Sequence, residues 1–285
     1  MSGPPRLDPD TAAQWDGHAK TYAQLFAPLT GHIARSMLGL IEARLPPAPR
    51  ILDIACGPGD LAVAAARLCA DRRGGGVLAT DLSPEMVALT QRALEPLSAY
   101  ARAEVRDGEA LGLSGAGFDA ALSCFGIFLF PDRRAGWRAA VEALKPEGIF
   151  ATSMWRGPGE NELGRVQAEA LFAALPGRLM DPPPRPDWAR LMAAEELVGE
   201  VTSAAPLADA EIHIVEATIA VPTPAAMTLG MIGNPVTGAL IAECAPDERV
   251  SLEAALTATF ERRAGGPDRP LVLNASCNVL VARRM

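Results

Sequence analysis

A carboxylate and two glycines stand close together at the end of an apolar run, where a small-molecule site could form. Asp53 lies within the run 51–54, and Gly57 and Gly59 follow it. The run predicts a buried strand, and the alanine-rich stretch 61–70 predicts a helix. Glycines at such a turn let a nucleotide-like ligand approach the N–H groups that a helix start leaves unpaired. A carboxylate there repels a pyrophosphate and suits a cationic or ammonium-bearing ligand.

A second carboxylate, Asp81, ends a predicted strand over residues 76–81. Ser83 and Pro84 then predict the start of a helix, with Ser83 as its cap. At the carboxyl end of a parallel strand, a carboxylate can accept two hydrogen bonds from vicinal ribose hydroxyls. Asp81 therefore indicates a ribose-bearing cofactor, although this feature alone does not separate a dinucleotide from another nucleoside.

An aromatic face with one histidine is predicted for a helix over residues 11–26, where Trp15, His18, Tyr22 and Phe26 recur at helical spacing. One interpretation is that this face packs on the core. The other makes His18 and Tyr22 catalytic candidates, with His18 as general base, because its unperturbed pKa is near neutrality and Tyr22 lies one turn away. The sequence leaves both interpretations open.

Four motifs resemble those of the class I S-adenosylmethionine (SAM)-dependent methyltransferases, in particular the UbiE-like small-molecule group (methyltransferase type 11/25). L-D-I-A-C-G-P-G over residues 52–59 resembles motif I, and W-D-x-x-A-x-x-Y occurs over residues 15–22. R-D-G-E-A-L occurs over residues 106–111, and F-G-I-F-L-F-P-D over residues 125–132 resembles the family's F-G-L-M-F-F-P-D. The motifs follow the family's order, and the match covers residues 11–156.

The resemblance implies an α/β fold with a doubly wound, mostly parallel seven-stranded sheet of the Rossmann-like methyltransferase type. The alternation of predicted strands and helices independently favours a parallel sheet with right-handed crossovers. We expect a helical lid over 1–45, a SAM-binding core over 46–221 with a helical insertion at about 156–186, a cap over 222–270 and the last core strand over 271–285. Within these divisions we expect strands over 149–155, 212–221 and 274–283, a helix over 187–198 and a proline loop at 181–184.

By resemblance, the cofactor is SAM, with S-adenosyl-L-homocysteine (SAH) as its product. The first helix would cover the cofactor, Asp81 would bind its ribose, and Asp107 would accept a hydrogen bond from the adenine amino group. The residues that the family motifs place at the cofactor are Tyr22, Arg35, Asp53, Ala55, Gly57, Gly59, Asp81, Leu82, Met86, Asp107, Gly108, Glu109, Ser123 and Phe125.

The acceptor pocket is expected to use Trp15, Phe26, Phe128 and Trp155. Aromatic walls fit a flat apolar molecule and also favour a sulfonium by cation–π contact, worth about 0.5–2 kcal/mol. We therefore expect methyl transfer to a small, largely apolar or aromatic acceptor of the quinone, indole, phenol or polyketide kind, in secondary metabolism. Carbon, nitrogen and oxygen acceptors remain open.

Composition excludes several other classes of function. The formal net charge is −8 and no basic run occurs, so nucleic acid is not an expected partner. No apolar run approaches membrane-spanning length, and the N-terminus lacks the apolar region of a secretion signal. The five cysteines form no C-x-x-C pair, so we expect no metal site and a reducing, cytoplasmic location. A monomer or a homodimer is expected.

Three rival interpretations differ from this prediction. A nicotinamide-dependent oxidoreductase of the short-chain type needs a Tyr-x-x-x-Lys pair, and neither Tyr22 nor Tyr100 has one. A catalytically silent SAM-binding regulatory or partner subunit would keep the same motifs. An isoprenoid or fatty-acid acceptor would also suit an apolar crevice.

Overall fold

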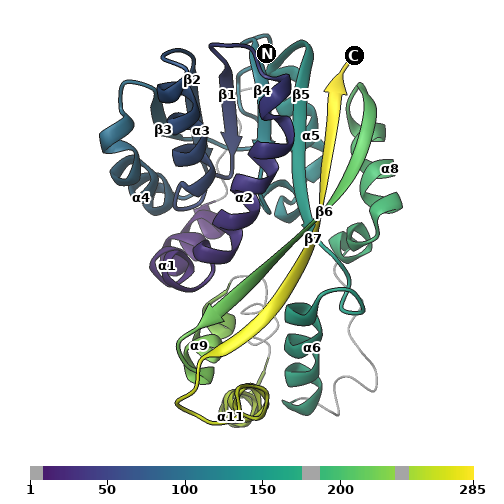
Figure 1. Cartoon of the computed structure of the whole chain (residues 1–285). Coiled ribbons are helices and arrows are strands. Elements are labelled where there is room, and N and C mark those ends of the chain that lie inside the picture. Colours follow the sequence, from purple (N-terminus) through teal and green to yellow (C-terminus); the bar gives the residue numbers. More distant parts are fainter. Residues whose placement is uncertain (1–8, 175–186, 235–243) are drawn as a thin grey trace.

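One sheet of seven strands, in the order β3-β2-β1-β4-β5-β7-β6, organises the computed structural model (Figure 1), which describes residues 9–174, 187–234 and 244–285. The strands are β1 (Arg50–Ile54), β2 (Gly76–Asp81), β3 (Ala101–Val105), β4 (Phe118–Ser123), β5 (Leu144–Trp155), β6 (Leu207–Val221) and β7 (Leu271–Arg284). Strands β1 to β5 pair in parallel, whereas β7 runs antiparallel between β5 and β6. The expected doubly wound, mostly parallel sheet is confirmed.

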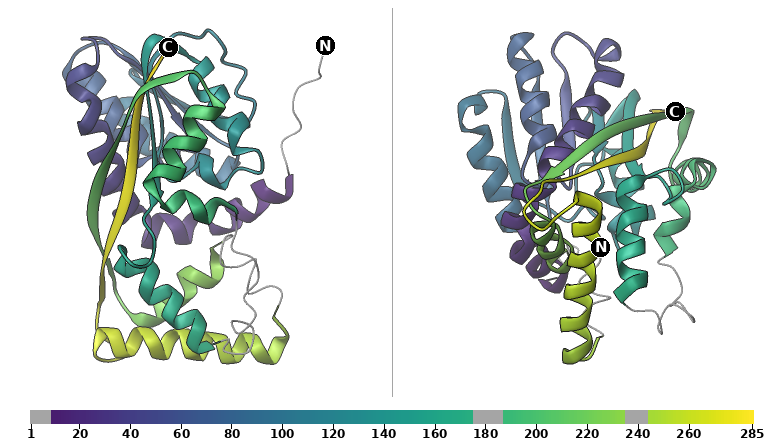
Figure 2. Two further views of the ribbon diagram at one scale, coloured as in Figure 1. Left: turned by 90° about the vertical axis from the view of Figure 1, so that its right-hand side faces the viewer. Right: turned by 60° about the horizontal axis from the view of Figure 1, so that its bottom comes forward.

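Helices cover both faces of the sheet (Figures 1 and 2). The α-helices are α1 (Pro9–Leu25), α2 (Ala27–Ile41), α3 (Asp60–Asp71), α4 (Pro84–Leu94), α5 (Arg133–Glu142), α6 (Glu162–Ala174), α8 (Ala194–Ala204), α9 (Pro224–Gly233) and α11 (Pro246–Ala264). Shorter 3-10 turns are η1 (Glu42–Arg44), η2 (Glu95–Leu97), η3 (Ile127–Leu129) and η4 (Asp187–Met192). None of the helices in the described ranges is long and apolar enough to cross a membrane.

The core forms where the central strands meet the helices. β1 and β4 are buried along almost their whole length, as a parallel strand between two helical layers requires. Two local signals fix where the helices begin: the Ser83 hydroxyl accepts from the Met86 N–H at the start of α4, and Asp132 accepts from the Ala135 N–H at the start of α5. Because β1, β2 and β4 run in parallel, their carboxyl ends lie at one common edge of the sheet.

A second lobe extends beyond this edge. We use that name for α6, α9 and α11 together with the paired ends 215–221 of β6 and 271–277 of β7 (Figure 1). α6 packs along α11, although most of the chain between them belongs to other elements. Glu162 joins the three parts, since its carboxylate accepts from the Asn274 N–H of β7 at 2.9 Å and pairs with Arg263 of α11. Two segments that are distant in sequence thus build one lobe.

Several element boundaries differ from the sequence expectation. β5 begins at Leu144 rather than 149, because Leu144 pairs with Phe118 across a register shift. β6 begins at Leu207 rather than 212, and β7 at Leu271 rather than 274, because the two strands pair along nearly their whole length. The helix expected over 187–198 is divided into η4 and α8 by extended backbone at Ala193. The expected proline loop at 181–184 lies outside the described residues.

Candidate active site

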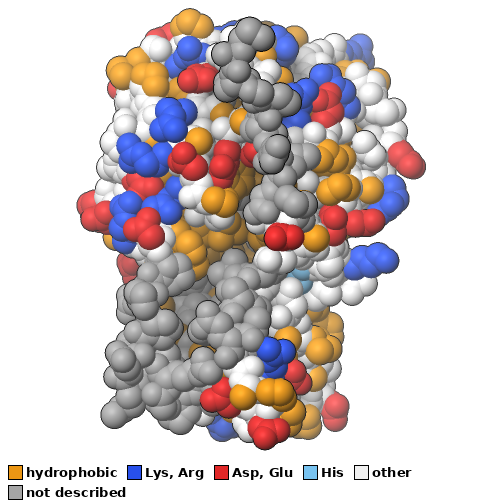
Figure 3. Space-filling view, turned by 180° about the vertical axis from the view of Figure 1, so that it is seen from behind, with side chains coloured by type: hydrophobic (Ala, Val, Ile, Leu, Met, Phe, Trp, Pro, Cys, Tyr) orange, Lys and Arg blue, Asp and Glu red, His pale blue; other side chains and the backbone are white. Residues whose placement is uncertain are grey.

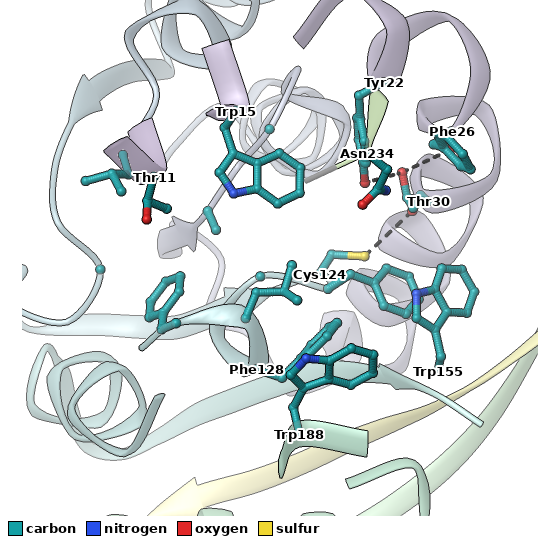
Figure 4. A pocket seen from close by; sticks show the side chains of 18 of the residues that line it. Thr11, Trp15, Tyr22, Phe26, Thr30, Cys124, Phe128, Trp155, Trp188 and Asn234 are labelled. Carbon is teal, nitrogen blue, oxygen red and sulfur yellow. Dashed lines mark hydrogen bonds between the residues drawn. The ribbon is translucent and has the colours of Figure 1, made fainter. Parts of the chain in front are cut away.

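A cavity of about 500 Å³ lies between the carboxyl edge of the sheet, the first two helices and the second lobe. Its walls are mostly apolar, and Figure 3 shows hydrophobic side chains gathered between the upper and lower parts of the molecule. The volume falls within the range of about 300–1,000 Å³ that is typical of small-molecule sites. The side chains in Figure 4 approach this space from both parts.

The glycine turn after β1 forms one end of the cavity wall. Gly57 and Gly59 adopt left-handed backbone conformations, with φ of 55° and 100°. A Cβ on Gly59 would lie 2.8 Å from the hydroxyl of Thr90, and that hydroxyl donates to the Gly57 carbonyl at 2.7 Å. Gly57 lines the cavity, whereas Gly59 supports the turn from behind. The turn therefore needs glycine for its shape and its close contact with α4.

Asp81 lines the cavity at the end of β2 and is tied to the same turn. Its two carboxylate oxygens accept from the Gly57 N–H and the Ser83 N–H, both at 2.9 Å. Burial raises the pKa of Asp81, and these two N–H groups oppose that rise. The N–H of Gly57 thus serves Asp81 rather than a ligand. Each carboxylate oxygen keeps capacity for another donor, which a ribose diol can supply.

Asp53 lies beneath the turn and does not line the cavity. Its side chain is 1% exposed, and its Oδ2 atom has no hydrogen-bond partner. Burial, followed by the negative charge of Asp81, raises the pKa of Asp53 to about 8. The group is therefore mostly protonated at neutral pH, and it can favour a cation in the cavity only after it has released its proton, through its charge and without contact.

The loop after β3 forms the next part of the wall. Asp107, Gly108 and Glu109 all line the cavity. Asp107 accepts from the Glu109 N–H at 2.9 Å, and Glu109 accepts from the Asp132 N–H at 2.8 Å. These bonds attach the loop to the start of α5. Leu82 and Met86 also contribute to the wall, and their apolar side chains suit one face of a base.

Two left-handed non-glycine residues, Ala55 and Phe125, lie just after β1 and β4 with φ of 55° and 59°. Both line the cavity, and such conformations cost of order 1–3 kcal/mol each, so they persist only where the surrounding contacts hold them. The Phe125 N–H donates to Ser153 at 2.9 Å, which supports that turn. The Ser123 hydroxyl accepts from the Ile127 N–H at 3.2 Å. Ser123 is fully buried and outside the lining, so its contact is with the turn itself.

Aromatic side chains dominate the half of the cavity next to the second lobe (Figure 4). The Phe125 and Trp155 rings stack with centroids 3.9 Å apart at 14°, and the Phe128 and Trp188 rings lie 5.7 Å apart. Trp188 was not expected from the sequence, because it follows the proline-rich stretch without a motif. The turn that carries it is held by Glu200, which pairs with Arg133 at 2.6 Å and also with Arg190.

The first helix closes the opposite side of the cavity with Trp15 and Tyr22, and Phe26 at the start of α2 joins them in the lining. Asp16 fixes this helix to the start of α4, where it accepts from the Ser83 hydroxyl and, at 3.0 Å, from the Glu85 N–H. The Tyr22 hydroxyl donates to Thr30 at 3.3 Å, and burial raises the pKa of Tyr22. The first helix therefore covers the cavity in this structure.

His18 and Arg35 do not line the cavity. The His18 ring is 2% exposed, its two nitrogens have no hydrogen-bond partner, and it packs against Gly233 of α9. Burial lowers the pKa of His18, which favours the neutral ring. Arg35 is exposed on α2, where its charge opposes the burial-driven rise in the pKa of Asp60. A role for His18 as general base stays a prediction.

Sequence reasoning missed part of the lining. Cys124, Asn161, Trp188 and Asn234 contribute side chains to the cavity. Cys124 directly precedes Phe125, so its position could have been inferred from the motif there. Asn161 stands immediately before a helix, where an Asn is usually taken for a cap. The other two lie in segments for which no motif was available.

The fold and the cavity together define an adenosine-cofactor enzyme of the doubly wound α/β class. A family described as "methyltransferase domain" matches residues 51–148. The ubiquinone/menaquinone biosynthesis C-methyltransferase UbiE of Caulobacter vibrioides is 32% identical over 171 residues, which cover 57% of this chain and 67% of that protein. An uncharacterized protein of Mycobacterium tuberculosis is 27% identical over 158 residues, which cover 55% of each chain. The chain thus spans about half the length of its mycobacterial relatives.

A solved structure shows the same fold. The YcgJ protein of Bacillus subtilis superimposes with a TM-score of 0.54 at 15% identity, covering 87% of this chain and 98% of that one. β7 runs antiparallel to β5, and this reversed strand separates methyltransferase sheets from dehydrogenase sheets. The sheet topology therefore agrees with the sequence comparison on the methyltransferase class. This chain belongs to the class I SAM-dependent methyltransferase family.

The residues of the cavity fit the family's cofactor. Asp81, Asp107 and Glu109 place acceptors along one wall of the cavity, and the buried Asp53, whose Oδ2 atom has no partner, lies beneath that wall. Such a wall suits a sulfonium, an ammonium, a ribose diol and an adenine amino group, and it disfavours a pyrophosphate. Tyr22 and Met86 add the apolar surface that a nucleoside needs.

Proposed function

We propose that this protein transfers a methyl group from SAM to a small, largely apolar or aromatic acceptor. The observation that carries the proposal is the continuity of one cavity, which joins the acidic wall at β1, β2 and β3 to the aromatic surfaces of Phe128, Trp155 and Trp188. A cofactor and an acceptor placed in these two halves would meet near Phe125 and Cys124. The relative from Caulobacter, which carries a quinone-biosynthesis name, supports an aromatic ring system as the acceptor.

SAM supplies an electrophilic methyl group when it is bound. The chain's own contribution is to hold the two molecules in line and to exclude water. Asp81 would accept from the ribose, Asp107 and Glu109 would face the adenine, and Asp53, once ionised, would favour the sulfonium charge from beneath the glycine turn. Alignment of this kind can supply on the order of 7–11 kcal/mol of a reaction barrier.

No histidine lines the cavity among the described residues. The titratable side chains of the lining include Asp81, Tyr22 and Cys124. Burial raises the pKa of Tyr22 and of Cys124, so both keep their own protons at neutral pH, and the Asp81 carboxylate is engaged by the Gly57 and Ser83 N–H groups. We therefore propose that rate enhancement rests on alignment, with an acceptor that loses its proton easily or has none to lose. Carbon, nitrogen and oxygen acceptors all satisfy this condition.

The proposal also covers the location of the protein, its partners and its oligomeric state. Cys56, Cys69, Cys124 and Cys277 are free thiols, which supports a reducing cytoplasm. The net charge of −8 supports a small-molecule acceptor rather than nucleic acid. A role in secondary metabolism and a monomeric or homodimeric state complete the proposal. Tyr100 lies at the opposite, amino end of the strands, which does not favour the oxidoreductase alternative.

The direct test is transfer of a labelled methyl group from SAM to a panel of phenols, hydroxyquinones, indoles and isoprenoid quinols. We expect SAH formation to depend on the acceptor and labelled product to appear from the aromatic compounds. SAM binding without turnover across the panel would instead support the silent regulatory subunit. Label found only in lipid extracts would support the isoprenoid or fatty-acid acceptor.

A further inference from the structure

Four charged side chains lie beside the acceptor half of the cavity and outside its lining, and we call them the charged cluster: Arg133, Asp187, Arg190 and Glu200. The Glu200 carboxylate of α8 is 3% exposed and pairs with both arginines. Taking a carboxylate out of water is costly unless cations complete it, and well-packed apolar residues in place of such a pair are often equally stable. The cluster is therefore weak evidence for stability, and its place in the fold needs a further explanation.

Arg133 connects the two segments that carry the Phe128 and Trp188 rings. It is the first residue of α5 and follows the turn that begins with η3, where Phe128 lies. Its guanidinium also pairs with Asp187, the residue immediately before Trp188. The two rings contact each other at a centroid distance of 5.7 Å and an angle of 57°. One side chain thus joins the backbones on both sides of this ring contact.

The charged cluster defines one orientation of the two segments. The Nε and Nη2 atoms of Arg133 donate to the two oxygens of Glu200, at 2.6 and 3.4 Å. Such a fork fixes the angle between the partners as well as their distance, which apolar packing does not. Arg190 places a second cation on the same carboxylate and donates to Asp187 at 3.2 Å. The two arginines therefore hold the start of η4 in a defined geometry.

The Trp188 ring depends on this attachment for its place in the cavity. Trp188 is half-buried and lines the aromatic half, where Figure 4 shows its ring beside Phe128. Its ring contact within the described part of the chain is the one with Phe128. The far end of η4 is held separately, by the Asn278 amide, which donates to the Met192 carbonyl at 3.1 Å. The charged cluster therefore controls the end of η4 that carries the ring.

We propose that Arg133 is a positioning residue for the acceptor, because it fixes Trp188 against Phe128 at the angle that receives a flat aromatic molecule. The inference rests on the proposed methyltransferase function and adds to it a determinant of acceptor affinity outside the cavity lining. Arg133 acts through Asp187 and Glu200 and touches neither the acceptor nor the cofactor. Without the cluster the Trp188 ring adopts a wider range of positions, so binding of the acceptor must then order the ring.

The test is a double-mutant cycle on the full chain, with 1-naphthol as the probe and calorimetry at saturating SAH as the measurement. Arg133→Gln and Glu200→Gln are combined in one cluster variant, so that neither buried charge is left without its partner. We expect the cluster variant to bind naphthol about threefold to tenfold more weakly than the wild type does, a usual size for coupled residues. In a Trp188→Ala background the same changes should alter the affinity less than about twofold, because the ring through which they act is absent.

Arg134→Gln is the matched control. It removes the neighbouring arginine of α5, which also reaches α8, at the hydroxyl and the carbonyl of Ser203, but among the described residues bonds to no part of η4. This control should keep the wild-type naphthol affinity, and both it and the cluster variant should keep SAH affinity within about twofold. Asp187→Asn is a second test variant, because its side chain is 70% exposed and the change leaves no buried charge. It should weaken naphthol binding about twofold.

Equal naphthol affinity of the wild type and a folded cluster variant would overturn the positioning role while the proposed function stands, and so would an equal loss in the Trp188→Ala background. If the cluster variant does not fold, an unchanged affinity in Asp187→Asn contradicts the role. A wild-type protein that binds SAH but not naphthol would overturn the role together with the aromatic acceptor. Absence of SAH binding would overturn the proposed function itself, and this inference with it.

Discussion

The two halves of the cavity are built in different ways. In the cofactor half, backbone N–H groups fix each carboxylate: Gly57 and Ser83 hold Asp81, and Glu109 holds Asp107. In the acceptor half, Trp155 at the end of β5 stacks on Phe125 and Trp188 of η4 packs against Phe128. A largely buried ion pair between Arg133 of α5 and Glu200 of α8 lies beside them. The first construction is rigid and local in sequence, whereas the second depends on side chains from distant segments. Changes should therefore affect the two halves independently.

The largest effect is expected for Asp81→Ala. This change removes the carboxylate that can accept from the ribose, and hydrogen bonds to charged groups are worth about 1.5–3 kcal/mol each. It also leaves the Gly57 and Ser83 N–H groups without their acceptor. We expect the dissociation constant of SAH, measured by calorimetry, to rise at least tenfold. The control is Asp119→Ala, which removes a carboxylate at the amino end of β4. Unchanged SAH affinity in Asp81→Ala would show that the cofactor does not bind at Asp81.

The next effect is a pH dependence carried by Asp53. Its pKa is raised to about 8 in the folded protein from an ordinary value near 4, so the folded state holds a proton that the unfolded state loses. The stability of the ligand-free protein should therefore fall as pH rises from about 4 to 8, with a slope of at most about 1.4 kcal/mol per pH unit from this group. Burial raises the pKa of Asp81 and of Asp60, which contribute in the same direction.

The same group should couple proton release to the binding of a cation. The affinity for SAM should increase between pH 6 and 9 relative to that for SAH, which lacks the sulfonium charge. Asp53→Asn should flatten both the stability slope and this difference. Denaturant unfolding and calorimetry at several pH values provide the measurements. If the ratio of SAM affinity to SAH affinity in the wild-type protein does not change with pH, the charge of Asp53 does not act on the bound cofactor.

A smaller, one-sided effect is expected for Trp188→Ala. The change removes one aromatic surface of the acceptor half and its contact with Phe128, and aromatic pairs contribute about 0.5–1.5 kcal/mol beyond their buried area. The KM for an aromatic acceptor should rise severalfold, while the SAH dissociation constant stays within twofold. The control is Phe172→Ala, which removes an exposed aromatic side chain on α6. Equal losses in acceptor and SAH binding would contradict the division into two halves.

The smallest effect is expected for His18→Gln. Since the ring lies outside the cavity lining, turnover at saturating SAM should change less than about threefold. Its pH profile should keep its shape. If instead a titrating limb near neutrality disappeared in this variant, His18 would regain the base role that its sequence position suggests. Any loss of thermal stability would be measured in parallel.

Most residues that the sequence assigned to the cofactor lie in the lining of the cavity, because they are contiguous with motifs, whereas Arg35, Asp53, Gly59 and Ser123 do not. Asp81 is the last residue of β2, and Gly57 and Asp107 lie two or three residues after β1 and β3, so the motif and the strand end specify the same place. The acceptor half was predicted only where a motif continued into it, at Phe128, and where a strand ended in an aromatic residue, at Trp155. Trp188 and Asn161 depend on how η4 and α6 pack, which no local pattern encodes.

Two further differences have a physical cause. His18 shares a helical face with Trp15 and Tyr22, yet the packing of α9 against that helix covers its ring and leaves the neighbours at the cavity. Asp53 belongs to the most specific motif, yet the strand buries it below the turn. Spacing places residues on a face of an element, but neighbouring elements decide which of them reach the ligand.

The most direct test of the account is a calorimetric titration of the wild-type protein with SAH, followed by 1-naphthol into the same cell. The account predicts one site for SAH and a second, compatible site for naphthol, so that both are bound together. Heat with a nicotinamide dinucleotide and none with SAH, or displacement of SAH by naphthol, would contradict the assignment of the two halves.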